Sequence, residues 1–239
     1  EAEQFGKKFE EQYWVPELSY YALGLDEHGT PLRVISSNPG HCLESGIMDE
    51  SRARHVMERL MDTDMFSGWG IRTLSSKMPA YNPMSYHNGS IWPHDNAMIA
   101  RGFCAHQRQD MVETVFHSLY EAARHLHYKR LPELFCGFGR DPFHLEDPPV
   151  RYPVACSPQA WAASASFGMI RSMLNFQRDW KTGNLVIRRP HLPSFTNYLR
   201  VSNLRLGEAE LTMEFRRADG MVLVDIPQRS GDLNVILEI

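Results

Sequence analysis

Hydrophobic residues recur every three to four positions in several segments before Phe176. Such spacing places them on one face of an α-helix. Local signals mark helix starts: Asp49 is a good N-cap, Pro93 suits a first turn, and Asp110 with Glu113 forms a capping box. The pattern therefore predicts helices over residues 1–14, 49–61, 93–107 and 110–126, and a further helix that Ser157 and Pro158 start and that runs to residue 174.

Two regions do not show the pattern of a simple amphipathic helix. Residues 160–174 are apolar or small almost all the way round, which indicates a helix buried on several sides. Residues 19–25 and 32–36 look extended and flank a polar turn at 26–30, so we expect a β-hairpin there.

The pattern changes after Phe176 to short runs in which apolar and polar residues alternate. Alternation of this kind is typical of half-buried strands, and Ala218-Asp219-Gly220 suits a hairpin turn. We predict strands over 185–188, 210–216, 221–226 and 234–238. The fold is therefore expected to be mainly α, with a small C-terminal antiparallel β appendage.

Composition and charge exclude several classes of protein. The chain is 43% hydrophobic and 23% charged, as in ordinary globular proteins, and its net charge is -4 without a basic run, so nucleic acid is not expected as a partner. No apolar run has the roughly 18 to 20 residues of a membrane span, and segment 1–14 is charged, so we expect a cytoplasmic protein without membrane contact. The four cysteines form no C-x-x-C pair, and we expect neither a metal nor any other cofactor.

Two long loops, 63–92 and 128–156, are expected to carry the chemistry, because loops of this length in compact domains are usually functional. The first loop and the helix start after it combine aromatic rings with polar side chains. Aromatic faces stack on sugar rings while polar groups satisfy hydroxyls, so the mixture suits a carbohydrate. The residues concerned are Trp69, Arg72, Tyr81, Tyr86, His87, Asn88, Trp92, His94, Asp95 and Asn96.

Asp95 lies in the first turn of its helix, where the helix dipole favours the ionised carboxylate. Two interpretations stay open: a carboxylate that binds sugar hydroxyls, and a helix-start acid paired with a nearby arginine. His87 and His94 have no third ligand at a suitable spacing, which disfavours a metal site.

Glu133 stands between Pro132 and Leu134 in an otherwise apolar tract of the second loop. Burial there would raise its pKa and suit it to acid or base catalysis. The alternative is a structural glutamate at the surface or paired with Arg130 or Arg140. The serine-hydrolase, zinc-protease and nucleotide-binding motifs are not found in this sequence.

Several long motifs resemble bacterial amylo-alpha-1,6-glucosidases, the glycogen-debranching-enzyme-like proteins of the six-hairpin glycosidases. They are SNPGHCLESGI (37–47), MFSGWGIRTLS (65–75), YNPMSYHNGSIWPHDNAMIARG (81–102), RLPELFCGF (130–138) and PVACSPQAWAASA (153–165). The resemblance implies that residues 1–180 are the C-terminal half of an (α/α)6 barrel and that residues 181–239 form the β-rich appendage.

The resemblance also implies an inverting reaction on α-glucosidic bonds, with two carboxyl groups roughly 6.5 to 9.5 Å apart. Glu133 in the Leu-Pro-Glu-Leu-Phe motif matches the general base. No segment resembles the family's Gln-Gly-Trp-Lys-Asp stretch with the general acid. The implied sugar-binding residues are Trp69, Arg72, Tyr86, Asn88, Trp92, His94, Asp95, Gln159 and Trp161.

Two hypotheses follow. The chain is a glycoside hydrolase, or the C-terminal part of one, that acts on an oligosaccharide or α-glucoside and lacks its acid. Alternatively, it is a non-catalytic helical module that binds saccharide or supports a partner. A half-barrel leaves apolar helix faces uncovered, so we expect self-association or a missing N-terminal half. A sugar epimerase or lyase is a third interpretation, but the motifs do not match those enzymes.

Overall fold

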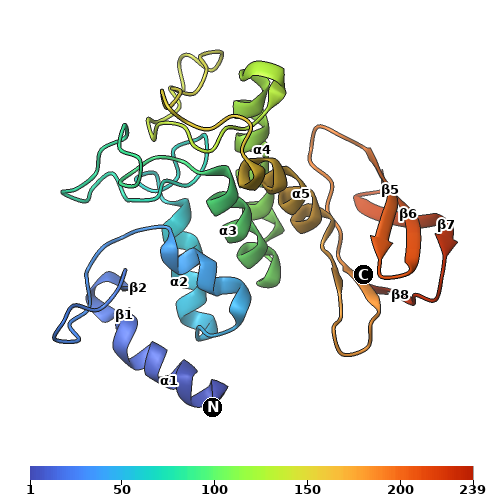
Figure 1. Cartoon of the computed structure of the whole chain (residues 1–239), viewed down its shortest axis with the longest axis horizontal. Helices are drawn as coiled ribbons and strands as arrows, with labels where there is room; N and C mark the ends of the chain where they lie inside the picture. The colour runs from blue at the N-terminus through green and yellow to red at the C-terminus, as the bar shows by residue number, and fades with distance from the viewer. Residues whose placement is uncertain (239) are drawn as a thin grey trace. The chain divides into compact units, whose positions relative to one another are not determined.

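The computed structural model describes residues 1–238 and divides into two compact units, Glu1–Met169 and Ile170–Ile239 (Figure 1). The helices of the first unit are α1 (Ala2–Tyr13), α2 (Glu50–Met61), α3 (Pro93–Ala105), α4 (Gln109–Arg124) and α5 (Ala160–Leu174), the last of which continues past the unit boundary. Three short 3-10 helices are also described: η1 (Pro16–Leu18), η2 (Asn38–Ser45) and η3 (His127–Lys129). The helices predicted over 1–14, 49–61, 93–107 and 110–126 are confirmed, whereas the helix expected to start at Ser157 begins at Ala160. The expectation that this last helix is buried on several sides is wrong, because the side chains of Trp161 and Phe167 are exposed.

Local signals explain the starts of α2 and α3. The Asp49 carboxylate accepts hydrogen bonds from the backbone N–H groups of Ser51 and Arg52, and Pro93 opens α3. The capping box at Asp110 is wrong. Helix α4 already begins at Gln109, and the Asp110 carboxylate pairs with Arg108 at 2.8 Å.

The predicted hairpin near the N-terminus is much smaller than expected. Strands β1 (Trp14–Val15) and β2 (Tyr20–Tyr21) pair antiparallel with each other, and a single bridge joins Leu25 to Pro31. Asp26 closes the turn by accepting a hydrogen bond from the Thr30 N–H at 2.8 Å.

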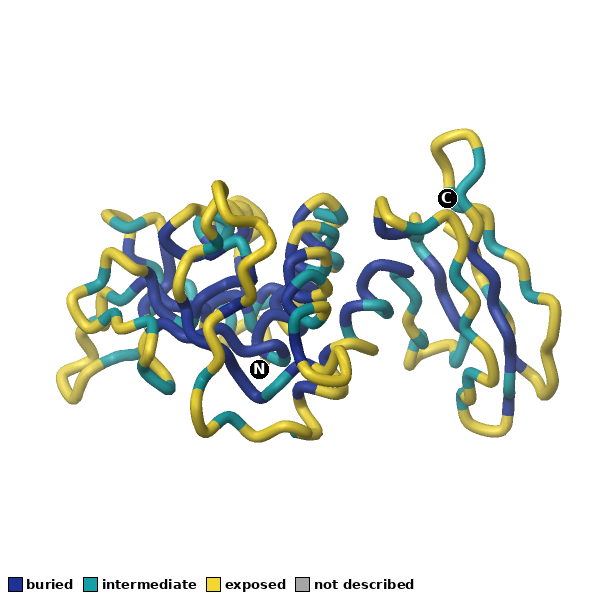
Figure 2. The backbone as a smooth tube through the Cα atoms, turned by 90° about the horizontal axis from the view of Figure 1, so that it is seen from above, coloured by how far each residue is buried: buried dark blue, intermediate teal, exposed yellow. Residues whose placement is uncertain are grey.

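Helix η2 packs closely on α3 because two glycines face the contact. A Cβ on Gly40 would lie 2.8 Å from Ile99 Cγ1, and a Cβ on Gly102 would lie 2.5 Å from the Leu43 Cβ. Leu60 and Phe103 are fully buried at this contact. Figure 2 shows the buried stretches of the backbone. This close approach places the side chains of η2 beside the start of α3.

Isolated backbone bridges tie the two long loops together. Ile91 bridges Arg72 on one side and Phe135 on the other, and Phe135 also bridges Arg151. The Ile91 and Phe135 backbones exchange hydrogen bonds of 2.9 Å and 3.0 Å. A Cβ on Gly137 would lie only 1.6 Å from the Gly89 carbonyl oxygen, so only glycine fits where the loops cross.

The second unit contains two three-stranded sheets. One has the order β3 (Phe176–Arg178), β4 (Leu185–Arg188), β8 (Val235–Glu238), and the other has the order β5 (Tyr198–Leu206), β6 (Ala209–Ala218), β7 (Met221–Ser230). Buried residues of β6, among them Met213 and Phe215, form the centre of its core (Figure 2). The predicted turn at 218–220 is confirmed, with Asp219 and Gly220 both at positive φ.

The prediction of a mainly α chain, half of an (α/α)6 barrel with a small antiparallel appendage, is wrong. Helices hold 34% of the residues and strands 23%, and the strands form three sheets. Two causes account for the difference: the long loops contribute backbone bridges, and β4 and β8 of the second unit pair in parallel. Within residues 1–238, the helices are all too short or too polar to cross a membrane.

Candidate functional site

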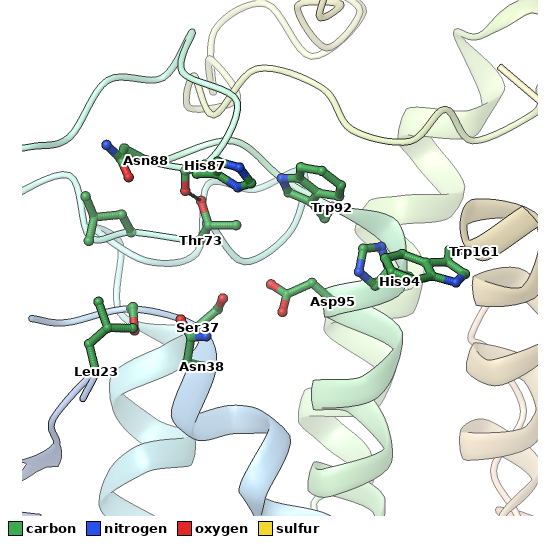
Figure 3. A pocket seen from close by; sticks show the side chains of 12 residues that line it. Leu23, Ser37, Asn38, Thr73, His87, Asn88, Trp92, His94, Asp95 and Trp161 are labelled. Atoms are coloured by element: carbon green, nitrogen blue, oxygen red, sulfur yellow. Dashed lines mark hydrogen bonds between the residues drawn. The ribbon is translucent and has the colours of Figure 1, made fainter. Parts of the chain in front are cut away.

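A cavity of about 410 Å³ opens in the first unit where η2, the first long loop, the start of α3 and the start of α5 meet (Figure 3). This volume lies within the range of small-molecule binding sites. Its lining consists of Leu23, Ser36, Ser37, Asn38, Thr73, Leu74, His87, Asn88, Trp92, His94, Asp95 and Trp161.

Aromatic rings form one wall of the cavity. The His87 and Trp92 rings stack with planes 4° apart and centroids 6.2 Å apart, and the His94 and Trp161 rings lie 4.6 Å apart. Trp161 is 60% exposed, so its face is available to a ligand. Flat apolar faces beside amides and hydroxyls are the features that bind sugar rings.

Asp95 stands in the first turn of α3 and is buried. One carboxylate oxygen, Oδ1, forms a short hydrogen bond with Nε2 of His41 on η2. The other oxygen, Oδ2, has no hydrogen-bond partner among the described residues, although it is buried. The partner of Asp95 is therefore a histidine from another element, not an arginine.

His94, the neighbour of Asp95, is held in its neutral form. Burial lowers the pKa of its imidazole below the ordinary value of 6.5. Its Nδ1 atom is buried and makes no hydrogen bond within residues 1–238. A neutral imidazole can both donate and accept, so His94 offers a second polar group at the cavity.

Glu133 is not among the lining residues but lies close enough to the lining residue His94 to interact with it electrostatically. The Tyr86 hydroxyl donates to Glu133 Oε1 at 2.7 Å, and the Cys156 backbone N–H donates to Oε2 at 3.2 Å. The Glu133 N–H donates in turn to the Cys156 carbonyl at 2.9 Å. The Tyr86 ring packs edge-on against Trp92 at 4.8 Å, which connects the carboxylate to the cavity lining.

These hydrogen bonds keep Glu133 ionised. The Tyr86 hydroxyl is the main cause of a pKa below the ordinary value of 4.5, and the same contact raises the pKa of Tyr86 to about 12. The expectation of a raised pKa from apolar neighbours is wrong, because the carboxylate is buried together with donors. A carboxylate of this kind is suited to accept a proton rather than to deliver one.

Three of the residues that the resemblance implied in sugar binding lie away from the cavity lining. The Arg72 guanidinium is buried and donates to the Gly137 carbonyl at 2.6 Å and to the Thr63 carbonyl at 3.1 Å. Trp69 is buried with the Arg140 guanidinium 4.4 Å from its ring centre. Gln159 accepts a hydrogen bond from the Ala162 N–H at the start of α5.

The structure brings the other implied residues together at or next to the cavity. Asn88, Trp92, His94, Asp95 and Trp161 line the cavity, and Tyr86 bonds Glu133 next to it. Six lining residues were missed from the sequence: Leu23, Ser36, Ser37, Asn38, Thr73 and Leu74. Their signals were the SNPGHCLESGI motif, which contains Ser37 and Asn38, and the MFSGWGIRTLS motif, which contains Thr73 and Leu74. Across the described residues, His, Cys, Asp and Glu side chains form no group of three or more suited to a metal ion.

Comparison with known proteins places the chain first in a class and then in a family. The site and the family match together define a glycoside hydrolase-like domain. Residues 1–137 match the mannosylglycerate hydrolase MGH1-like glycoside hydrolase domain, and the chain belongs to that family. The narrower resemblance to amylo-alpha-1,6-glucosidases is not confirmed by this match. A search of curated proteins gives no match.

Solved structures share the fold. A protein titled "Sialidase" is 12% identical, with a TM-score of 0.70 over 98% of this chain and 23% of that one. The GH63 mannosylglycerate hydrolase from Thermus thermophilus in complex with Tris is 18% identical, with a TM-score of 0.50 over 66% of this chain and 34% of that one. The chain thus spans about a quarter to a third of the length of these structures.

Proposed function

We propose that this chain carries the general base of an inverting glycoside hydrolase that cleaves α-glucosidic bonds. The observation that carries the proposal is Glu133, a buried carboxylate kept ionised by Tyr86 and the Cys156 N–H beside an aromatic-walled cavity. The family match supports a carbohydrate substrate.

In the proposed reaction, Glu133 takes a proton from a water molecule as the water oxygen attacks the anomeric carbon. The bond from that carbon to the glycosidic oxygen breaks, and the leaving oxygen receives a proton from a general acid. Attack from the face opposite the leaving group inverts the configuration. An α-glucoside therefore gives β-glucose as its first product.

The general acid is proposed to come from another chain segment or a partner, because the buried acids of the first unit are poor proton donors. Burial disfavours charge on Asp64, but hydrogen bonds from Arg59 and Ser75 outweigh it and lower the pKa of Asp64 to about 2. Asp95 is hydrogen-bonded to His41, and this hydrogen bond raises the pKa of the His41 imidazole. Glu133 is itself an anion at neutral pH, for the reasons given above.

The cavity favours an uncharged sugar. Its lining contains the carboxylate of Asp95 and two histidines, of which His94 is neutral, and the twelve lining residues include neither lysine nor arginine. Recognition of an anionic aglycone such as glycerate would call for one of those cations. The α-1,6-linked glucosides isomaltose and panose are the substrates that we propose.

α-Glucosyl fluoride gives the sharpest test, because fluoride leaves without help from a general acid. The full chain should release fluoride and form β-glucose, followed with a fluoride electrode and by proton NMR. The Glu133→Gln variant should lose the activity, whereas Glu146→Gln, which alters an exposed glutamate of the same loop, should retain it.

Each other outcome has a definite meaning. Formation of α-glucose, or equal rates for Glu133→Gln and wild type, would refute the assignment of Glu133 as the base of an inverting enzyme. Binding of glucose without fluoride release would favour the alternative of a non-catalytic saccharide-binding module. Faster fluoride release from α-mannosyl fluoride than from α-glucosyl fluoride would overturn the proposed substrate class.

A further inference from the structure

His41 occupies a position that the proposed reaction does not use. It projects from η2 toward the first turn of α3, and the glycine contacts described above hold these two helices close together. Its side chain is 32% exposed, whereas the side chain of its partner Asp95 is only 9% exposed. A partly exposed imidazole therefore holds a buried carboxylate.

The two oxygens of Asp95 have different surroundings. His41 binds Oδ1, whereas Oδ2 makes no hydrogen bond within the described part of the chain. Leaving a buried charged oxygen without a donor costs free energy, so such an atom calls for a ligand that can donate a hydrogen bond. Figure 3 shows the Asp95 carboxylate turned toward Ser37 and Asn38 across the cavity.

We propose that His41 is a positioning residue of the sugar site: it fixes Asp95 so that Oδ2 accepts a hydrogen bond from a hydroxyl group of a neutral sugar. This inference rests on the proposed function, because it assumes that the cavity holds a sugar. The donor that completes Asp95 is a hydroxyl rather than an ammonium or guanidinium group, since the His41 imidazolium already balances the carboxylate charge.

The geometry supports this role over a simple ion pair between helices. An ion pair made for stability would satisfy both oxygens or face solvent, as Arg59 satisfies both oxygens of Asp64 at 2.9 Å and 2.6 Å. The His41 contact is one-sided, and the oxygen that it leaves open belongs to a residue that lines the cavity. The orientation of Asp95 is thus set from outside the cavity.

The test is glucose affinity of the full chain and its variants, measured by calorimetry, with melting temperature recorded for each. Asp95→Asn should weaken binding about tenfold to a hundredfold, as expected for a lost charge-assisted hydrogen bond. His41→Leu should weaken it about tenfold, and His41→Gln, which keeps an N–H donor, should stay within about threefold of wild type.

A second histidine provides the matched control. His106 also joins α3 to η2, through a hydrogen bond of 3.1 Å to the Leu43 carbonyl, but it does not line the cavity. His106→Leu should lower the melting temperature and leave glucose affinity unchanged. In the Asp95→Asn background, His41→Leu should cause no further loss of affinity, because His41 acts through Asp95.

The outcomes separate the two proposals. Glucose binding by wild type with undiminished affinity in His41→Leu, or a full additional loss in the Asp95→Asn background, overturns the role of His41 and leaves the proposed function standing. Failure of wild type to bind glucose, mannose or isomaltose overturns the proposed function and the sugar-binding role of His41 together. If His41→Leu does not fold, His41→Gln and Asp95→Asn still decide the question. Comparable losses of glucose affinity in these two variants overturn the positioning role of His41.

Discussion

Replacing Gly137 by alanine should force the two long loops of the first unit apart. The added Cβ would lie 1.6 Å from the Gly89 carbonyl oxygen, whereas real contacts of this kind are not shorter than 3.0 Å, so the backbone must retreat by about 1.4 Å. The Gly137 carbonyl accepts from Arg72 Nε at 2.6 Å and from the Tyr81 hydroxyl at 3.0 Å, and a movement of that size would break these contacts.

The expected cost follows from these two effects. Overpacking against rigid backbone costs about 1 to 3 kcal/mol, and the lost hydrogen bonds cost about 1 to 2 kcal/mol more. We therefore expect Gly137→Ala to lower the free energy of unfolding of the first unit by about 2 to 5 kcal/mol.

Urea unfolding followed by tryptophan fluorescence measures this change. A Trp180→Phe background removes the one tryptophan of the second unit, whose side chain is exposed, and leaves four in the first unit. Gly139→Ala is the matched control, because its Cβ would meet Arg72 Nη2 at an ordinary 3.6 Å, and it should change stability by less than about 1 kcal/mol. Equal stability of the two variants would refute the steric argument.

Three further changes test other parts of the structure. Ionised Asp64 stabilises the fold by about 2 kcal/mol above pH 3.8, and this stabilisation is lost as the pH falls toward 2. The free energy of unfolding of Asp64→Asn should therefore depend less on pH in this range than that of the wild type. Tyr86→Phe should raise the pKa of Glu133 and move the acidic limb of fluoride release to higher pH; an unmoved limb would contradict the proposed control. Phe215→Ala should destabilise the second unit by about 3 to 5 kcal/mol in circular dichroism melts, and an unchanged melt would place Phe215 outside its core.

Features set by neighbouring residues were predictable from the sequence. The cap at Asp49, the helix start at Pro93 and the turn at 218–220 depend on residues within a few positions, and all three are confirmed. Strand β5 was missed because its pairing with β6 shifts register between Val201 and Leu204, which interrupts the alternation. The parallel pairing of β4 with β8 joins residues 50 positions apart and leaves no local pattern.

The same distinction applies to the site. Asp95 and Glu133 stood out because a lone carboxylate in an aromatic or apolar segment is unusual in itself. Their partners did not, since His41 is 54 positions from Asp95 and Tyr86 is 47 positions from Glu133. The pKa of Glu133 was consequently predicted in the wrong direction, because its donors come from chain segments that only folding brings together.

The backbone bridges between the loops have a consequence for how this site can change. The loops are held in place by isolated backbone bridges rather than by continuous strands. These bridges join Arg72, Ile91, Phe135 and Arg151. Residues 141–148 are exposed and lie between the bridges at Phe135 and Arg151. Residues can therefore be inserted or exchanged there while the base and the aromatic wall keep their positions, which makes this loop a natural place to alter substrate preference by loop grafting.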